Sequence, residues 1–198
     1  MIQFNNSSQE TPYLIFKDKY NDSKKAKQSN IEAISIASYS SKAKEVSARF
    51  VNLKFINDKE FIFFSNYNSL KSQDFISHSQ ITALIYWNSI NTQIRIKAKI
   101  KRTSRDYNLA YFAQRGGKKN ALAISSDQSN RISSYSDVHK NYDKTLKAEN
   151  LKECPEYWGG YSFTPYYFEF WEGHESRLNK RDVYEKNGDN WHHFLLQP

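Results

Sequence analysis

The alternation of apolar and polar residues is most regular in the stretch TQIRIKAKIKR, residues 92–102. Ile94, Ile96, Ala98 and Ile100 alternate with basic residues, so the apolar side chains face one way and the basic ones the other. We expect a half-buried β-strand there. Similar alternation, or a concentration of β-branched and aromatic residues, predicts strands at 31–40, 46–56, 60–66, 81–87, 168–173 and 181–196.

Helical spacing of apolar residues is clearest in segment 11–28. Tyr13, Leu14, Phe16 and Tyr20 are spaced like one face of a helix and follow a Thr-Pro pair typical of a helix start. Further helices are expected at 69–78, at 104–117 with Ser104 as its cap and the Gly116-Gly117 pair as its stop, and at about 134–147.

The order of these segments indicates the fold class. Strands follow one another with short turns, at Asn88–Asn91 and at the Asn187-Gly188 pair, and only a few helices intervene. This order favours a mainly β, α+β protein with an antiparallel sheet or small barrel flanked by helices, not a parallel sheet. We expect a polar, flexible tail over residues 1–10 and a single domain over 11–198.

Composition narrows the class of partner. The net charge of +8 favours anionic partners, and the aromatic content of 16% argues against disorder. The single cysteine, Cys154, allows no disulfide within the chain and suits a reducing compartment. Because no stretch approaches 18 apolar residues, we expect a soluble, cytoplasmic protein without membrane association.

Common catalytic motifs are missing from the sequence. It contains no GxGxxG, no Walker loop, no CxxC pair and no HExxH, and its five histidines lack the spacing of metal ligands. A hydrolase or a metal enzyme is therefore not expected.

Several short blocks together indicate a family. They are RFVNLK (49–54), FFSNYNSLK (63–71), TQIRI (92–96), YFAQR (111–115), SDQSNRIS (126–133), YWGGY (157–161), EFWEG (169–173), RLNKR (177–181) and the closing QP. In their order and spacing they resemble the pyridoxamine 5'-phosphate oxidase family, from about Pro12 to Pro198. The resemblance implies an antiparallel split β-barrel with flanking helices, assembled as a homodimer that binds FMN between its subunits.

The resemblance also implies a cofactor site. Arg49, Ser65 and Lys71 would hold the FMN phosphate, and a guanidinium, a hydroxyl and a point cation suit a dianion. The implied FMN positions are Arg49, Phe50, Val51, Asn52, Leu53, Lys54, Phe64, Ser65, Lys71, Gln93, Gln128, Ser129, Trp171 and Arg181.

A second cationic group would bind the substrate phosphate. The resemblance assigns this role to Lys54, Tyr111 and Arg115, with Lys119 beside them, and places the catalytic pair Arg177 and Asn179 near the substrate ring. Tyr111 and Arg115 are four residues apart on a predicted helix, so they face one side. The implied reaction moves a hydride from pyridoxamine or pyridoxine 5'-phosphate to FMN. Molecular oxygen then accepts the electrons, leaving pyridoxal 5'-phosphate and hydrogen peroxide.

The chain departs from the family pattern mainly at the substrate side. Asn179 replaces a histidine, Lys180 an aspartate and Lys119 a serine, while Leu70 replaces an arginine beside Lys71. Asparagine hydrogen-bonds but does not titrate near neutrality. A flavoprotein of the same fold with a different substrate is therefore an alternative.

A third hypothesis comes from another class of protein. Basic strand faces and abundant tyrosines also suit a barrel that binds single-stranded nucleic acid or stores a phosphorylated ligand without catalysis. This hypothesis leaves the ordered blocks unexplained, so we expect no nucleic-acid partner.

Overall fold

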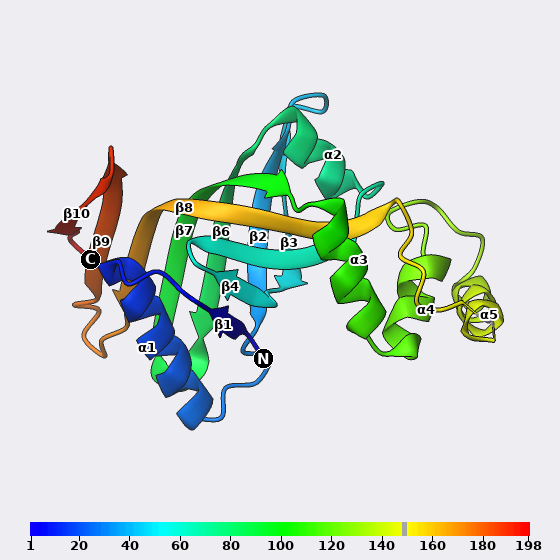
Figure 1. Ribbon diagram of the computed structural model, residues 1–198. Helices are drawn as coiled ribbons and strands as arrows, with labels where there is room; N and C mark the ends of the chain where they lie inside the picture. The colour runs from blue at the N-terminus through cyan, green and yellow to red at the C-terminus, as the bar shows by residue number, and fades with distance from the viewer. Residues whose placement is uncertain (148–149) are drawn as a thin grey trace.

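A ten-stranded sheet forms the body of this computed structural model, which describes residues 1–147 and 150–198 (Figure 1). The strands are β1 (Gln3–Asn5), β2 (Ala33–Ser40), β3 (Glu45–Asn52), β4 (Phe55–Asn57), β5 (Glu60–Asn66), β6 (Gln80–Trp87), β7 (Thr92–Arg102), β8 (Trp158–Glu172), β9 (Lys180–Asn187) and β10 (Asn190–Leu195). The helices are α1 (Thr11–Lys25), α2 (Leu70–Ser77), α3 (Arg105–Gln114), α4 (Gly117–Ser125) and α5 (Tyr135–Leu146), with a 3-10 turn η1 (Asn88–Ile90).

Strand β8 joins the two halves of the sheet. One of its edges pairs with β7 from Tyr161 to Glu172. The other edge pairs with β5 at residues 158–163 and with β9 at residues 167–172. Pro165 lies between these two stretches and is paired with Ala98 on β7, where the register between the two strands shifts. The sheet therefore splits at Pro165, with β9 and β10 leaving on one side (Figure 1).

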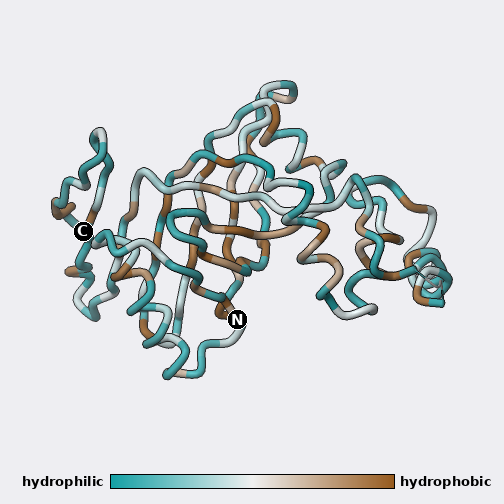
Figure 2. Tube along the Cα trace, in the orientation of Figure 1, coloured by the Kyte–Doolittle hydropathy of each residue, from teal (hydrophilic) through white to brown (hydrophobic). Residues whose placement is uncertain are grey.

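Helix α1 closes one end of this sheet with aromatic side chains. Phe16 is fully buried, with its ring centroid 5.0 Å from that of Phe61 and 5.6 Å from that of Trp87. Burying one such side chain contributes about 1.5–3 kcal/mol. Tyr13 and Tyr20 are buried as their spacing predicts, whereas Leu14 is exposed. Apolar residues are concentrated on the central strands (Figure 2).

Three predictions about elements agree with the structure. In β7, Ile94, Ile96 and Ala98 are fully buried, and the intervening basic residues are not. The hydroxyl of Ser104 accepts a hydrogen bond from the backbone N–H of Tyr107 and so caps α3. The Asn187-Gly188 pair joins β9 to β10 as a hairpin.

Other predictions about elements are wrong, each for a local reason. The strand expected at 46–56 is two strands, because the chain changes partner after Leu53. The backbone N–H of Leu53 still donates to the carbonyl of Glu32 beside β2, whereas that of Lys54 donates to the carbonyl of Ile62 on β5, both at 2.8 Å. The Gly116-Gly117 pair begins helix α4 instead of only ending α3. In place of a flexible tail, residues Gln3–Asn5 pair in parallel with β4, and Ile2 is buried.

The glycines of YWGGY allow α3 to pack closely on β8. A Cβ at Gly159 would collide with the hydroxyl of Tyr67, and one at Gly160 with the hydroxyl of Thr103. The side chain of Asn108 on α3 accepts a hydrogen bond from the backbone N–H of Gly160 at 2.8 Å. This motif is thus part of strand β8, and it fixes the position of α3.

Two negative findings concern the part of the chain that the structure describes. None of its helices is long and apolar enough to cross a bilayer. No group of three or more histidine, cysteine, aspartate or glutamate side chains there could hold a metal ion.

Candidate functional site

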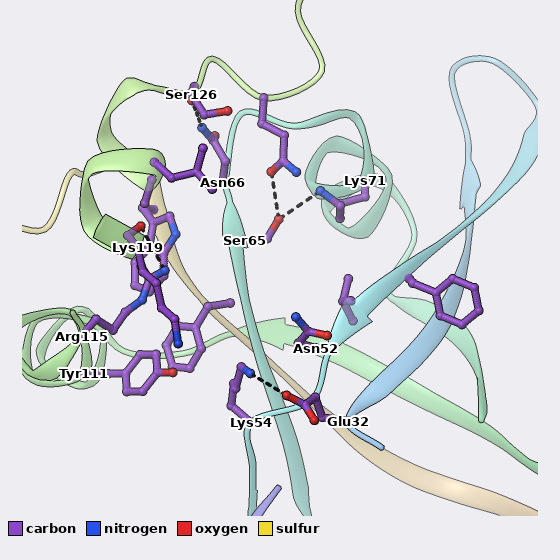
Figure 3. A pocket seen from close by; sticks show the side chains of 17 residues that line it. Glu32, Asn52, Lys54, Ser65, Asn66, Lys71, Tyr111, Arg115, Lys119 and Ser126 are labelled. Atoms are coloured by element: carbon purple, nitrogen blue, oxygen red, sulfur yellow. Dashed lines mark hydrogen bonds and ion pairs between the residues drawn. The ribbon is translucent and has the colours of Figure 1, made fainter. Parts of the chain in front are cut away.

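A cavity of about 590 Å³ lies between β3, β5 and α2 on one side and α3 and α4 on the other (Figure 3). Its volume falls within the range of about 300–1,000 Å³ typical of ligand pockets. The predicted site residues that line it are Phe50, Val51, Asn52, Lys54, Phe64, Ser65, Lys71, Tyr111, Arg115, Lys119 and Gln128.

One end of the cavity holds a buried cation. Lys71, on α2, is 8% exposed, and its Nζ donates to the hydroxyls of Ser65 at 3.0 Å and Ser69 at 3.1 Å. The Ser65 hydroxyl in turn donates to Gln128 Oε1 at 3.3 Å (Figure 3). No carboxylate among the described residues lies within ion-pair distance of Lys71. Burial, together with the nearby charge of Arg49, lowers the pKa of Lys71 to about 8. An anionic ligand would compensate this charge.

Arg49 supports this end from behind the cavity wall and does not line it. Its Nη1 donates to the hydroxyl of Ser38 at 2.6 Å and to the carbonyl of Ile36 at 3.2 Å. Its Nη2 lies 3.8 Å from a carboxylate oxygen of Asp74. Burial lowers the pKa of Arg49. The structure thus places Ser65 and Lys71 in the cavity, while Arg49 affects it through charge.

The other end of the cavity is built from aromatic rings and cations. The ring of Tyr111 stacks on Phe64 with centroids 4.0 Å apart, and the guanidinium of Arg115 lies 4.4 Å from the centroid of Trp158. Arg115 Nη1 is buried and has no hydrogen-bond partner among the residues that the structure describes. Burial lowers the pKa of Arg115 and raises that of Tyr111. Lys119, on α4, completes this end (Figure 3).

The connection between α3 and α4 holds these cations in place. Asn120 is fully buried, and its Nδ2 donates to the carbonyls of Phe112 at 3.0 Å and Leu151 at 2.8 Å. Arg115 and Lys119 lie on either side of the resulting bend, and Arg115 Nη2 donates to the carbonyl of Lys119 at 3.4 Å. The bend brings both side chains to the same end of the cavity.

Three predicted FMN residues lie together at another part of the sheet. Gln93, Trp171 and Arg181 are neighbours in register on β7, β8 and β9. None of them lines the cavity. Strand β9 and helix α4 lie at opposite ends of the molecule (Figure 1). A single chain therefore forms two separate groups of predicted site residues.

Glu169 holds Arg181 in this second group. Its carboxylate is 3% exposed and accepts hydrogen bonds from Arg181 Nε at 2.9 Å and from the Tyr167 hydroxyl at 3.0 Å. Arg95 forms an ion pair with the same carboxylate. Burial alone would raise the pKa of Glu169, but hydrogen bonds from Arg95, Arg181 and Tyr167 outweigh it and lower the pKa.

The remaining predicted residues also lie outside the cavity lining. The side chain of Leu53 is fully buried in the core. Ser129 and Arg177 occupy left-handed backbone conformations, with φ of 78° and 60°. In the loop between β8 and β9, Asn179 Oδ1 accepts a hydrogen bond from the backbone N–H of His174 at 3.0 Å. Asn179 thus closes this loop onto itself.

The cavity includes residues that the sequence did not single out. Trp158 and Asn66 stand within quoted blocks but carried no assigned role. Others lie on or beside α4, a helix that the sequence did not predict, and Glu32 had no sequence signal at all. The residues missed are Glu32, Asn66, Leu122, Ala123, Ser126 and Trp158.

Comparisons with known proteins show which proteins this chain resembles in sequence. Residues 158–198 match the pyridoxine 5'-phosphate oxidase C-terminal dimerisation region. A pyridoxine/pyridoxamine 5'-phosphate oxidase from Colwellia psychrerythraea is 33% identical over 202 residues, covering 97% of this chain and 89% of the relative. A protein of the same name from Cytophaga hutchinsonii is 35% identical over 171 residues, covering 84% of this chain and 79% of the relative.

Solved structures confirm the predicted antiparallel split barrel. PhzG from Burkholderia lata, crystallised with tetrahydrophenazine-1-carboxylic acid, has a TM-score of 0.90 at 23% identity, covering 96% of this chain and 93% of PhzG. A pyridoxamine 5'-phosphate oxidase-related, FMN-binding protein from Nostoc punctiforme has a TM-score of 0.78 at 10% identity, covering 96% of this chain and 99% of that protein.

Proposed function

The chain belongs to the pyridoxamine 5'-phosphate oxidase family and is an FMN-dependent oxidase of that family, and from this premise we propose its substrate. The substrate is pyridoxamine or pyridoxine 5'-phosphate, which the enzyme oxidises to pyridoxal 5'-phosphate with molecular oxygen, releasing hydrogen peroxide. The observation that carries this proposal is one cavity with two cationic ends, suited to two phosphate groups.

Lys71 and Ser65 bind the FMN phosphate in this proposal. The buried ammonium of Lys71 has two hydroxyl partners and no carboxylate partner among the described residues, so a dianion fits there. The side chain of Gln128, hydrogen-bonded to Ser65, is placed to extend this contact. Bound FMN supplies the two-electron acceptor that none of the side chains can provide.

Tyr111, Arg115 and Lys119 bind the substrate phosphate, together with Lys54. Nη1 of Arg115, which has no hydrogen-bond partner in the described part of the chain, is a donor available to an anion. The stacking of Arg115 on Trp158 and of Tyr111 on Phe64 fixes both side chains before the ligand arrives, which lowers the cost of binding. Arg177 and Asn179 are proposed to contact the substrate ring.

A second copy of the chain completes the site in this proposal. Gln93, Trp171 and Arg181 lie far from the cavity of their own chain, and the match to a dimerisation region includes Trp171 and Arg181. A homodimer with FMN at its interface would place these three residues of one copy against the cavity of the other.

A direct test identifies the cofactor and the product. Purified protein should be yellow, denaturation should release FMN, and pyridoxamine or pyridoxine 5'-phosphate should produce hydrogen peroxide with pyridoxal 5'-phosphate. A yellow, FMN-loaded protein that forms peroxide with neither compound would contradict the substrate assignment.

A different substrate is the second candidate, and Asn179 favours it. The Asn179 Oδ1 is engaged with the backbone N–H of His174, and the ammonium of the neighbouring Lys180 pairs with Asp182 at 2.8 Å. Neither side chain therefore supplies a group that titrates near neutrality, as a histidine would. The variant Asn179→His separates the two candidates. A large gain in turnover of pyridoxine 5'-phosphate supports a weakened vitamin B6 site, whereas no gain favours another substrate.

A further inference from the structure

Glu32 is the one carboxylate among the described residues that line the cavity. The other charged residues in that lining are all cations: Lys54, Lys71, Arg115 and Lys119. Figure 3 shows Glu32 beside Lys54, at the end of the cavity opposite Lys71. A negative charge in a cavity built from cations calls for an explanation.

The backbone of Glu32 is held firmly at the start of β2. Its carbonyl accepts a hydrogen bond from the backbone N–H of Leu53 at 2.8 Å, and the next residue, Ala33, pairs in register with Asn52. Burial alone would raise the pKa of Glu32. Its own backbone N–H, the amino group of Met1 and Lys54 outweigh burial and lower the pKa, so the carboxylate is charged at neutral pH.

Lys54 is only loosely held by this carboxylate. The Lys54 Nζ lies 3.5 Å from Glu32 Oε1, and the Lys54 side chain is 29% exposed. By contrast, Arg115 is fixed by stacking on Trp158. Glu32 therefore acts on a ligand through its charge and not by fixing the position of Lys54.

We propose that Glu32 is a specificity-determining residue of this cavity that weakens the binding of a doubly charged phosphate beside Lys54. This inference rests on the proposed function, because it concerns the end assigned to the substrate phosphate. Coulomb repulsion scales with the ligand's charge, so Glu32 penalises a dianion more than a monoanion or an uncharged group.

The test compares Glu32→Gln with wild type, both loaded with FMN, by isothermal titration calorimetry. The probes are deoxypyridoxine 5'-phosphate, which has a methyl group in place of the oxidisable substituent, and deoxypyridoxine, which lacks the phosphate. Glu60→Gln is the matched control, because Glu60 pairs with Lys101 at 2.7 Å outside this cavity.

We expect Glu32→Gln to bind the phosphorylated probe more tightly, by roughly threefold to thirtyfold. The gain should shrink at high salt. Affinity for deoxypyridoxine should change by less than about twofold, and Glu60→Gln should match wild type with both probes.

Equal or weaker binding of the phosphorylated probe by Glu32→Gln would overturn the inference, as would absence of binding by both proteins. Failure of the proposed function is a separate result. It would be seen as no peroxide formation by wild type with either pyridoxamine or pyridoxine 5'-phosphate. Even then, tighter binding of the phosphorylated probe by Glu32→Gln would still support the role of the Glu32 charge.

Discussion

Lys71 shows how a single buried charge prepares a site for its ligand. Among the described residues its ammonium is hydrogen-bonded to two hydroxyls and to no carboxylate, and its pKa of about 8 reflects burial and repulsion from Arg49. The folded, ligand-free protein therefore tolerates this cation at a cost in stability. A phosphate removes that cost when it binds.

Replacing Lys71 by methionine should separate stability from binding. We expect Lys71→Met to lower FMN affinity by roughly tenfold to hundredfold, since hydrogen bonds to charged groups contribute about 1.5–3 kcal/mol. The free energy of unfolding of the FMN-free protein should not fall, because an uncompensated buried charge is removed. Titration of flavin fluorescence and chemical denaturation measure the two quantities. The control is Lys99→Met, an exposed lysine on β7, and unchanged FMN affinity in Lys71→Met would contradict the assignment.

The pKa of Lys71 also predicts a pH dependence. Because the folded pKa, about 8, lies below the ordinary value of 10.5, the folded ligand-free protein binds fewer protons than the unfolded chain between these values. The contribution of Lys71 to the free energy of unfolding should therefore rise with pH across this window, by up to about 3 kcal/mol. FMN affinity should fall above pH 8, as the neutral amine loses its attraction for phosphate. In Lys71→Met both trends should be absent.

At the scale of single elements, the sequence predicted the strand with a regular apolar pattern, but not the elements whose form depends on packing against distant residues. The alternation in β7 follows from one face packing on the core, and the sequence displays it directly. The sequence predicted a strand only from residue 168, whereas β8 begins at Trp158. The reason for Gly159 and Gly160 is the close approach of Tyr67 and Thr103, which lie elsewhere in the sequence. Helix α4 was missed because Gly116 and Gly117 resemble a helix stop, although the Asn120 side chain stabilises the bend that starts a new helix.

The hairpin between β9 and β10 allows a test of backbone conformation alone. Gly188 has φ of 60°, and a Cβ there would meet no atom within 4 Å. Gly188→Ala should therefore destabilise the protein by about 1–2 kcal/mol through the left-handed conformation only. Gly117→Ala, inside the first turn of α4, should be neutral or stabilising by up to about 1 kcal/mol. Thermal melting compares the two, and equal effects would argue against this explanation.

At the scale of the whole molecule, the sequence blocks fall into two groups in space. The spacing of residues within a block says nothing about which blocks meet in space, so the separation of Lys71 from Arg181 could not be predicted from the sequence. The cavity group could be predicted through the resemblance, whereas Glu32 and the α4 residues depended on tertiary structure. In the proposed homodimer, the second group of one copy would meet the cavity of the other copy.

A mixed dimer tests whether one FMN site uses two chains. Lys71→Met and Arg181→Gln subunits, carrying different tags, are co-expressed and the heterodimer is isolated. If each site combines Lys71 of one copy with Arg181 of the other, one site is intact and about one FMN per dimer binds tightly. If both residues serve the same site from one chain, each site carries a defect and tight binding is absent. Melting of each homodimer checks that both variants fold.

Strand β8 has a consequence for how this protein can change over evolutionary time. The same continuous backbone forms a wall beside the cavity through β5 and carries the segment matched to dimerisation through β9. A shift of this strand by one residue would invert the facing of its side chains in both places at once. New substrates are therefore expected to arise through side chains on α3, α4 and the loops, while the path of β8 stays fixed.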